Sequence, residues 1–222
     1  MTDKEIEECY NNCIEYCNKI KSPILKECCQ EIYSNYKEKL INKPAIPGRH
    51  HYFKGGLLYH IYCVTRNSYN IANMYPNLNI DMDLILFGAL LHDIGKTNEY
   101  NDFRKDESYI ARKGNGAELL GHSYEGVHIV DNYLSKYEID EYFKNQVLHM
   151  IGNHMKEFRE EGIFVETKML EVIIISFADN IDNYLEPASK VINEIGKGEK
   201  YEFPKAGVPY YKSLNPYYNS RT

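Results

Sequence analysis

The stretch ALLHDIGKTNEY, residues 89–100, places His92 and Asp93 side by side at the end of an apolar run. The run begins with LILFGALL, residues 84–91, which is apolar on all sides and therefore predicts a helix in the centre of the molecule. A carboxylate buried in such surroundings is costly unless it is paired or bound to a metal ion. Asp93 is therefore expected to have a partner that comes from elsewhere in the chain.

The rest of the chain is predicted to form helices separated by connectors. Asp81 or Asp83 can cap the start of the central helix, and Gly95 is predicted to end it. Apolar residues recur at three- and four-residue steps in six further segments. These are residues 3–20, 23–41, 57–75, 119–136, 140–155 and 167–185, with a short helix beyond Pro187. The predicted fold class is all-α, with any strand confined to a long polar loop at about 97–117.

Charge and hydropathy restrict the partners. The 222 residues include 26 basic and 32 acidic side chains, for a net charge of −6. This balance argues against a protein that coats nucleic acid, because affinity for the phosphate backbone comes from clustered Lys and Arg. It still allows a pocket that takes a nucleotide or a strand end. We expect no membrane partner, because no apolar run approaches the ~18–20 residues of a membrane span.

The cysteines and the N-terminus favour a cytoplasmic protein. None of the six cysteines forms a C-x-x-C pair, so neither disulfides nor a zinc knuckle are expected. Cys9, Cys13 and Cys17 are spaced four apart and more simply form one apolar stripe of a helix. The N-terminus, MTDKEIEECYNN, lacks the apolar stretch of a signal peptide. The expected compartment is the cytoplasm.

Several histidines stand where a buried core is expected. His60 lies in the first turn of the 57–75 helix, His122 begins one helix and His154 ends another, while Asp179 follows the apolar run IIISFA. A single buried histidine is most often a satisfied core residue. Histidine and aspartate from four or five separate helices, however, have few better reasons to converge than a cation. Such ligands suit Mn, Fe, Co, Ni or Zn, and one or two ions are compatible with the pattern.

The neighbouring pair His92-Asp93 also limits how the ion is held. Adjacent residues of a helix point about 100° apart, so one metal can take both only where the helix loosens. Gly95 is predicted to supply that loosening. The second carboxylate oxygen of Asp93 can bridge to another cation.

In order along the chain, His60, His92-Asp93 and Asp179 resemble the H…HD…D signature of the HD superfamily of metal-dependent phosphohydrolases. Five blocks resemble in particular the branch of YhaM-type 3′→5′ exoribonucleases. They are HHYFKGGLLYH, LLHDIGK, AELLGHS, LHMIGNH and FADNIDNYL. The similarity runs from about residue 40 to 186. It implies an HD-domain helical bundle with a central metal site.

The resemblance also implies a division of the chain and a set of ligands. Residues 1–40 would form an N-terminal helical extension, 41–187 the HD domain, and 188–222 a C-terminal helix and tail packing on it. The first ion would be held by His60, His92, Asp93 and Asp179, with Asp93 bridging to a second ion on His122 and His154.

The sequence departs from this branch in two places. The branch usually has a histidine pair where this chain has His154-Met155, and a thioether is a poor ligand for such cations. We therefore expect a weaker second site, for which His149, five residues before His154, is the candidate supporting residue. The branch also carries an OB-type nucleic-acid domain ahead of the HD domain, where this chain has only about 40 helical residues. We therefore expect weaker binding of long RNA.

Other residues are predicted to support hydrolysis. A bound metal lowers the pKa of its water, so that the resulting hydroxide can attack phosphorus. Because Asp93 would hold this metal, it is assigned to catalysis as well as to metal binding. Lys96 could hold a phosphate oxygen, or simply be a solvated lysine at a helix end. His51, with His50, could donate to the phosphate or the leaving group. Arg112 could guide a phosphate, although an ordinary solvated loop explains it as well. Asp182 is expected to orient a ligand histidine.

The predicted function is a metal-dependent phosphohydrolase or phosphodiesterase that acts on a nucleotide or a short RNA or DNA, with 3′→5′ exonuclease action suggested by the resemblance. A nucleotidase or cyclic-nucleotide phosphodiesterase is the alternative within hydrolysis. An HD-type di-iron oxygenase is a second class, although His154-Met155 and the nuclease-like blocks count against it. A module that binds nucleotide without turnover is a third class, disfavoured by the complete ligand set.

Overall fold

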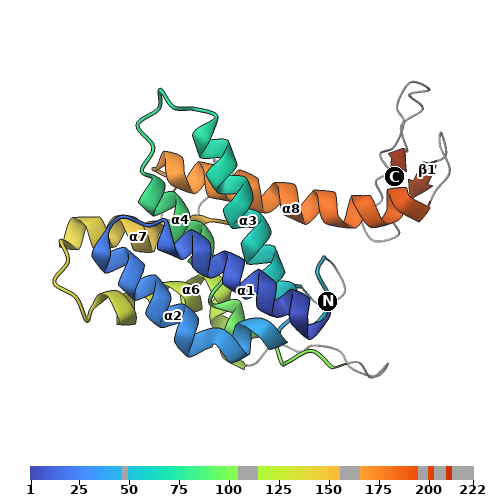
Figure 1. The fold of residues 1–222 in the computed structure, drawn as a ribbon, viewed down its shortest axis with the longest axis horizontal. Coiled ribbons are helices and arrows are strands. Elements are labelled where there is room, and N and C mark those ends of the chain that lie inside the picture. Colours follow the sequence, from blue (N-terminus) through green and yellow to red (C-terminus); the bar gives the residue numbers. More distant parts are fainter. Residues whose placement is uncertain (47–49, 105–114, 156–165, 195–199, 203–208, 212–222) are drawn as a thin grey trace. The chain divides into compact units, whose positions relative to one another are not determined.

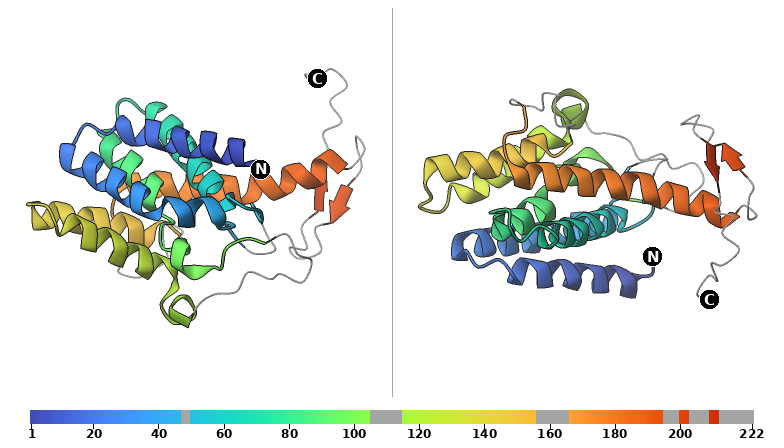
Figure 2. Two further views of the ribbon diagram at one scale, coloured as in Figure 1. Left: turned by 60° about the horizontal axis from the view of Figure 1, so that its bottom comes forward. Right: turned by 90° about the horizontal axis from the view of Figure 1, so that it is seen from above.

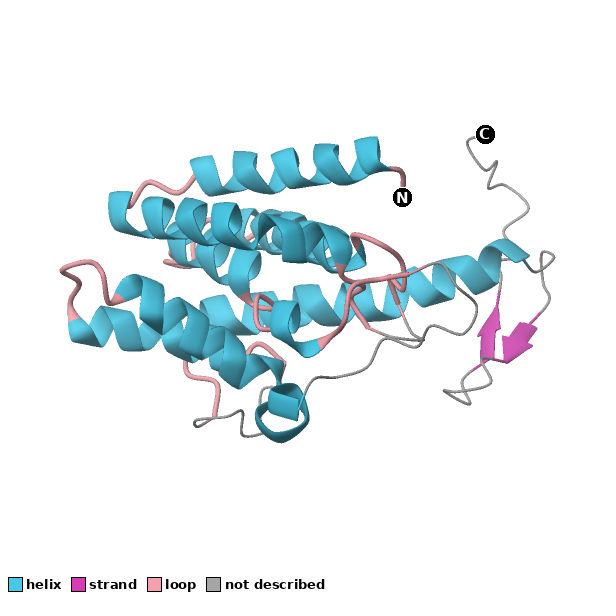
Figure 3. Ribbon diagram, turned by 90° about the horizontal axis from the view of Figure 1, so that it is seen from below, coloured by secondary structure: helices cyan, strands magenta, loops and turns pink. Residues whose placement is uncertain are grey.

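The fold is known from a computed structural model, which describes residues 1–46, 50–104, 115–155, 166–194, 200–202 and 209–211. Helices make up most of this part of the chain (Figures 1 and 3). They are α1 Asp3–Asn18, α2 Pro23–Asn42, α3 Gly56–Asn73, α4 Met82–Leu91, α5 Lys96–Glu99, α6 Asn115–Leu134, α7 Glu141–Asn153 and α8 Leu170–Glu194. The all-α fold class is confirmed.

The chain divides into two compact units, Met1–Asp182 and Asn183–Thr222. The first unit contains α1 to α7 and the first half of α8. The second unit contains the end of α8 and a short antiparallel pair, β1 Lys200–Glu202 with β2 Pro209–Tyr211, in which Tyr201 lies opposite Tyr210. The candidate site described below lies entirely within the first unit.

Helix α4 lies at the centre of the first unit, as its all-round apolar sequence predicts. Every residue from Leu84 to Leu91 is buried, and the helix packs against α1, α2, α3 and α7. Helices α1, α2 and α3 lie side by side around it (Figure 2). Buried residues of α1, α2, α4, α6 and α7 belong to one continuous hydrophobic cluster. A smaller cluster joins α8 to α3 and α4 through Ile175 and Ala178.

The two aspartates at the start of α4 have different roles. Asp81 is the N-cap, and its side chain accepts hydrogen bonds from the backbone N–H groups of Asp83 and Leu84. Asp83 instead accepts from the backbone N–H groups of Lys21 and Ser22, at 2.9 and 2.7 Å. The turn between α1 and α2 is thereby fixed to the beginning of α4.

Three structural features differ from the sequence-based expectation. Pro187 does not end the helix that contains it, because α8 continues to Glu194; a proline removes only one N–H donor, so its cost is local. The expected loop at 97–117 is shorter, since α5 begins it and α6 starts at Asn115. The strands of the described chain lie in the second unit and not in that loop. Within the described residues, no helix has the length and apolarity needed to cross a lipid bilayer.

All six cysteines are free and buried, and the predicted stripe of Cys9, Cys13 and Cys17 faces the core from α1. Burial raises the pKa of Cys28 and of Cys63 to about 12. Thiolate is the reactive form of cysteine, so these thiols are expected to be unreactive in the native protein.

We therefore expect a thiol reagent at pH 8 to label almost no cysteine in native buffer and all six after guanidinium is added. An unfolded thiol titrates near its ordinary pKa of 9.0, whereas the buried Cys28 keeps its proton to about pH 12. The free energy of unfolding should therefore fall as the pH rises above 9. Denaturation midpoints measured from pH 8 to 10.5 check this; native labelling at the rate of free cysteine would contradict it.

Candidate metal centre

Six side chains that the sequence predicts as ligands meet in one buried cluster. They come from α3, from the residues that follow α4, from α6, from the end of α7 and from α8: His60, His92, Asp93, His122, His154 and Asp179. Five of them are at most 4% exposed. His122 is the exception, with a side chain that is 16% exposed. Residues separated by more than 100 positions in the sequence therefore surround one small volume.

Asp93 is the centre of this cluster. Its Oδ2 lies 3.2 Å from Nε2 of His60 and 3.5 Å from Nε2 of His92. Its Oδ1 lies 3.6 Å from Nε2 of His122 and 3.5 Å from Nε2 of His154. The two carboxylate oxygens thus face two different histidine pairs.

These atoms divide into two groups that could each hold a metal ion. One contains His60, His92 and Asp93, and its ligand atoms all lie within 4.8 Å of one another. Asp179 adjoins this group, with Oδ1 at 3.1 Å from Nε2 of His60. The other group contains Asp93, His122 and His154 and meets the same criterion. Asp93 is shared, as expected for a bridging carboxylate.

Each of the four histidines is oriented by an acceptor at its Nδ1. His92 and His154 are held by the backbone carbonyls of Ala89 and Ile151, each at 2.7 Å and three residues earlier in the chain. His60 is held by Oδ2 of Asp182 at 2.7 Å. An acceptor at Nδ1 keeps the proton there and leaves the Nε2 lone pair directed at the cluster.

The fourth histidine, His122, lies at ion-pair distance from Glu99, whose Oε2 is 3.2 Å from Nδ1 of His122. Glu99 is a buried residue of α5 that the sequence analysis missed. Its only signal in the sequence is its place three residues after Lys96, on the same face of a helical turn.

Several polar atoms of the cluster have no hydrogen-bond partner although they are buried. These are Oδ1 of Asp93 and Nε2 of His122 and of His154. Burial of an unsatisfied polar atom costs about 1–3 kcal/mol, more when the group is charged. Two imidazole nitrogens and a carboxylate oxygen facing one point form a donor set that suits a divalent transition metal. The residues present therefore fit a cation.

For Asp93, His92 and His122, the surroundings favour the protonation states that metal ligands need, whereas the carboxylates around His60 favour its charged form. Burial opposes ionisation of Asp93, but Lys96 and His92 hold the pKa of its carboxyl well below the ordinary value. Burial lowers the pKa of His92 to about 4 and also lowers the pKa of His122. Burial likewise opposes the charge on His60, but the carboxylates of Asp179, Asp182 and Asp93 raise its pKa well above the ordinary value.

Two glycines bring His122 to this centre. Gly95 was expected to loosen the end of α4, but its φ of −62° is helical, and α4 already ends at Leu91. Its lack of a side chain matters for packing instead: a Cβ there would lie 2.0 Å from the carbonyl oxygen of His122 and 2.6 Å from the amide nitrogen of Gly126. Gly121, with φ +75°, kinks α6 immediately before His122.

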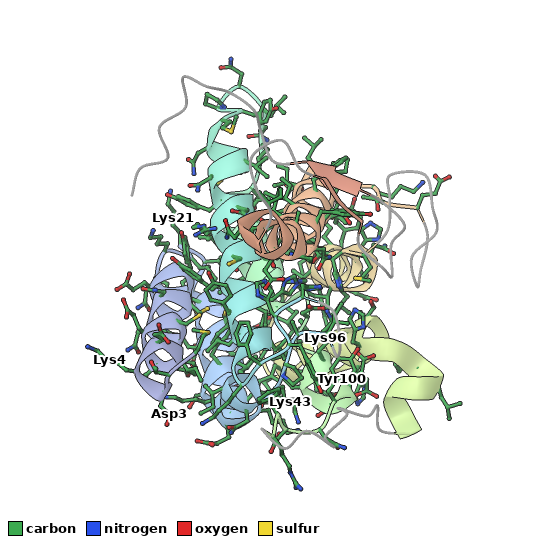
Figure 4. The ribbon with its side chains drawn as sticks, turned by 90° about the vertical axis from the view of Figure 1, so that its right-hand side faces the viewer. Asp3, Lys4, Lys21, Lys43, Lys96 and Tyr100 are labelled. Carbon is green, nitrogen blue, oxygen red and sulfur yellow. The ribbon has the colours of Figure 1, made fainter. Side chains whose placement is uncertain are left out.

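Lys96 and the 50–56 segment lie beside the first group. Nζ of Lys96 is 2.6 Å from Oδ2 of Asp93, and the side chain lies in the interior, whereas Lys4 and Asp3 lie at the periphery (Figure 4). Burial opposes the charge on Lys96, but Asp93 raises the pKa of the ammonium. A second carboxylate, Asp179, acts in the same direction. The ammonium is therefore held in its charged form.

His51 and His50 have different surroundings. Nε2 of His51 lies 2.9 Å from Oδ2 of Asp182, the same oxygen that holds His60. His51 also has a strained backbone, with φ +47°, and its carbonyl oxygen packs so closely that a Cβ on Gly56 would lie 1.9 Å away. His50 is buried, its ring centroid is 5.2 Å from that of His60, and its Nε2 has no hydrogen-bond partner.

The remaining predicted residues lie outside the cluster. His149 contacts the side-chain amide of Asn153 and accepts from the backbone N–H of Lys168, and no contact with the six ligands is found for it in the described chain. Met155, which follows His154, is 45% exposed and adds no donor to the second group. Arg112 lies outside the described residues.

The comparisons with known proteins agree with this geometry. Residues 57–184 match the family model of the HD domain, and the chain belongs to that family. Among curated proteins, the chain is similar to the 3′-5′ exoribonuclease YhaM of three organisms. The identity is 27% over 202 residues for Bacillus licheniformis, 27% over 200 for Bacillus subtilis (strain 168) and 26% over 192 for Halalkalibacterium halodurans.

These alignments include nearly all of this chain but only about three fifths of each relative. They cover 90, 89 and 86% of this chain and 62, 61 and 58% of the respective relatives. The chain therefore spans about three fifths of the length of the curated relatives it matches. No solved structure gives a significant match. The resemblance predicted from the five sequence blocks is confirmed.

Proposed function

We propose that the protein is a metal-dependent hydrolase of phosphoester bonds in nucleotides or short oligonucleotides, with 3′→5′ removal of nucleotides from RNA as its leading activity. The observation that carries this proposal is the bridging position of Asp93 between two groups of inward-facing donor atoms. The names of the curated relatives, which are 3′-5′ exoribonucleases, support the choice of RNA.

The ligands divide as the resemblance implies. His60, His92, Asp93 and Asp179 would hold one ion, and Asp93, His122 and His154 would hold the other. When bound, divalent cations activate water for attack on phosphorus and offset the charge on the departing oxygen. The second group offers three protein donors, which leaves coordination positions for water or substrate, as in catalytic metal sites.

Residues beside the ligands would act on the phosphate. Lys96 presents a buried ammonium group next to Asp93, where it can attract a phosphate oxygen and stabilise the charge of the transition state. His50, whose Nε2 lacks a hydrogen-bond partner, and His51 lie beside the first group and would contact the phosphate or the leaving group. Arg112 remains a proposed guide for incoming phosphate.

A second candidate is a nucleotidase or cyclic-nucleotide phosphodiesterase. The net charge of −6 favours it, because a protein that holds long RNA gains affinity from basic surface. The two candidates use the same ligands and differ in the substrate, which is either a single nucleotide with a monoester or cyclic diester, or the terminal diester of an RNA strand.

The test is elemental analysis of the purified protein, followed by removal of metal with a chelator and addition of Mn²⁺. Substrates are bis-p-nitrophenyl phosphate, mononucleotides, cyclic nucleotides, and RNA and DNA oligonucleotides labelled at the 5′ end. We expect metal-dependent hydrolysis, with RNA shortened stepwise from its 3′ end. His122→Ala should reduce it strongly, whereas His128→Ala, on the exposed side of the same helix, should not. Failure to hydrolyse any phosphoester with metal present would contradict the proposal.

A further inference from the structure

Glu99 is a buried carboxylate that contacts the cluster from the side opposite to the ligand atoms. It is 1% exposed, and its Oε2 lies 3.2 Å from Nδ1 of His122. The other ring nitrogen of His122, Nε2, faces Oδ1 of Asp93 at 3.6 Å. Glu99 therefore acts on His122 through the imidazole ring and is not itself placed among the inward-facing donor atoms.

The four Nδ1 acceptors form a regular pattern. In each metal group, one histidine is held by a backbone carbonyl and one by a carboxylate. Asp182 holds His60 in the first group, and Glu99 holds His122 in the second. A backbone carbonyl cannot be removed by substitution, but each carboxylate can. The two groups can therefore be perturbed separately, through a residue that touches no ion.

The second group depends on its carboxylate more than the first does. It has three protein donors, whereas Asp179 gives the first group a fourth. His122 is also the most exposed of the six, and it follows directly after the kink at Gly121. A rotation of its ring would leave only Asp93 and His154 as donors, which is too few to hold an ion against water.

We infer that Glu99 is the positioning residue of the second cation site and decides whether the second ion is retained. This inference rests on the two-ion arrangement proposed above. The carboxylate fixes the proton on Nδ1, aims Nε2 at the site and increases the basicity of that nitrogen. Outer partners of this kind change metal affinity by roughly 10- to 100-fold when they are replaced.

The experiment measures Mn²⁺ binding to chelator-treated protein by titration calorimetry, together with the electron paramagnetic resonance signal of coupled Mn²⁺ pairs. Four proteins are compared: wild type, Glu99→Gln, Asp182→Asn and Glu125→Gln. The last replaces an acidic residue of α6 that contacts Asn98 and serves as the matched control. Far-ultraviolet circular dichroism verifies that each variant remains helical.

Wild type and Glu125→Gln should bind two ions per chain and show the coupled signal. Glu99→Gln should bind the first ion with unchanged affinity, bind the second roughly 10- to 100-fold more weakly and lose the coupled signal. Glu99→Ala, which leaves no acceptor at all, should weaken the second ion further. Asp182→Asn should weaken the first ion instead.

Unchanged binding of both ions by Glu99→Gln would overturn the inference, and so would an equal loss of both ions, which indicates a structural role. A wild-type protein that binds one ion and still hydrolyses phosphoesters would overturn it while leaving the proposed hydrolase intact. A wild-type protein that binds two ions but hydrolyses no phosphoester would instead overturn the proposed function and leave the role of Glu99 measurable.

Discussion

Asp93→Asn is expected to abolish tight metal binding and to reduce metal-dependent hydrolysis by at least about 10³-fold, which corresponds to about 4 kcal/mol of transition-state stabilisation. Asparagine keeps the size of the side chain but has one acceptor oxygen in place of two. Both oxygens of Asp93 are directed at candidate ligand groups, because Oδ2 lies near His60 and Oδ1 near His154. The two groups can then no longer share this ligand, and its negative charge is lost to both.

The same substitution removes the carboxylate that lies 2.6 Å from Nζ of Lys96 and leaves a buried ammonium without its main counter-charge. The double variant Asp93→Asn/Lys96→Met removes both charges and therefore separates loss of metal from loss of folding. Asp131→Asn, a surface carboxylate paired with Lys144, is the matched control and should behave as wild type. Hydrolysis within tenfold of wild type in a metal-loaded Asp93→Asn protein would refute the bridging role.

Gly95→Ala is expected to destabilise the protein by at least about 3 kcal/mol, at the upper end of the range for overpacked cores. The new Cβ would lie 2.0 Å from the carbonyl oxygen of His122, and backbone cannot move aside as a flexible side chain can. Helix α6 would have to shift, which would move His122 from Asp93 and weaken the second ion. The midpoint of thermal unfolding should fall by roughly 6–12 °C.

Gly88→Ala provides the comparison, because it adds a Cβ to another buried glycine of the same unit. The nearest atom is Cδ1 of Ile175 at 2.7 Å, the end of a side chain that can change rotamer. The gain in helix propensity of about 1 kcal/mol offsets part of that cost. Thermal unfolding and Mn²⁺ titration of both variants test this prediction. If the two variants lost the same stability, the close approach of α6 would not be the reason for glycine at position 95.

The fold was largely predictable because local patterns determine it. Helix α4 is apolar on every side, and only a central position satisfies such a sequence. The other helices carry apolar residues at helical spacing, and some, such as α1 and α7, begin at residues with capping side chains, Thr2 and Asp140. The ends were less predictable, since a proline often ends a helix, whereas α8 continues through Pro187.

The ligands of the candidate site were predictable for a different reason. Histidine and aspartate stand at the ends of apolar segments, where burial makes an unpaired polar group costly, and the order of the blocks matches a known family. Glu99 was not predictable, because it follows Lys96 in a stretch that reads as polar loop. Its role arises only when Gly95 lets α6 approach, which is a property of the packed structure.

The hydrogen bonds from Lys21 and Ser22 to Asp83 have a consequence for how the molecule loses its structure. They tie the N-terminal hairpin of helices to the helix that leads into His92, and both belong to one hydrophobic cluster. The first 40 residues therefore cannot melt as an independent extension. Denaturant should unfold these residues in the same cooperative transition as the ligand cluster. Bound metal would therefore also raise the denaturant concentration at which the hairpin unfolds.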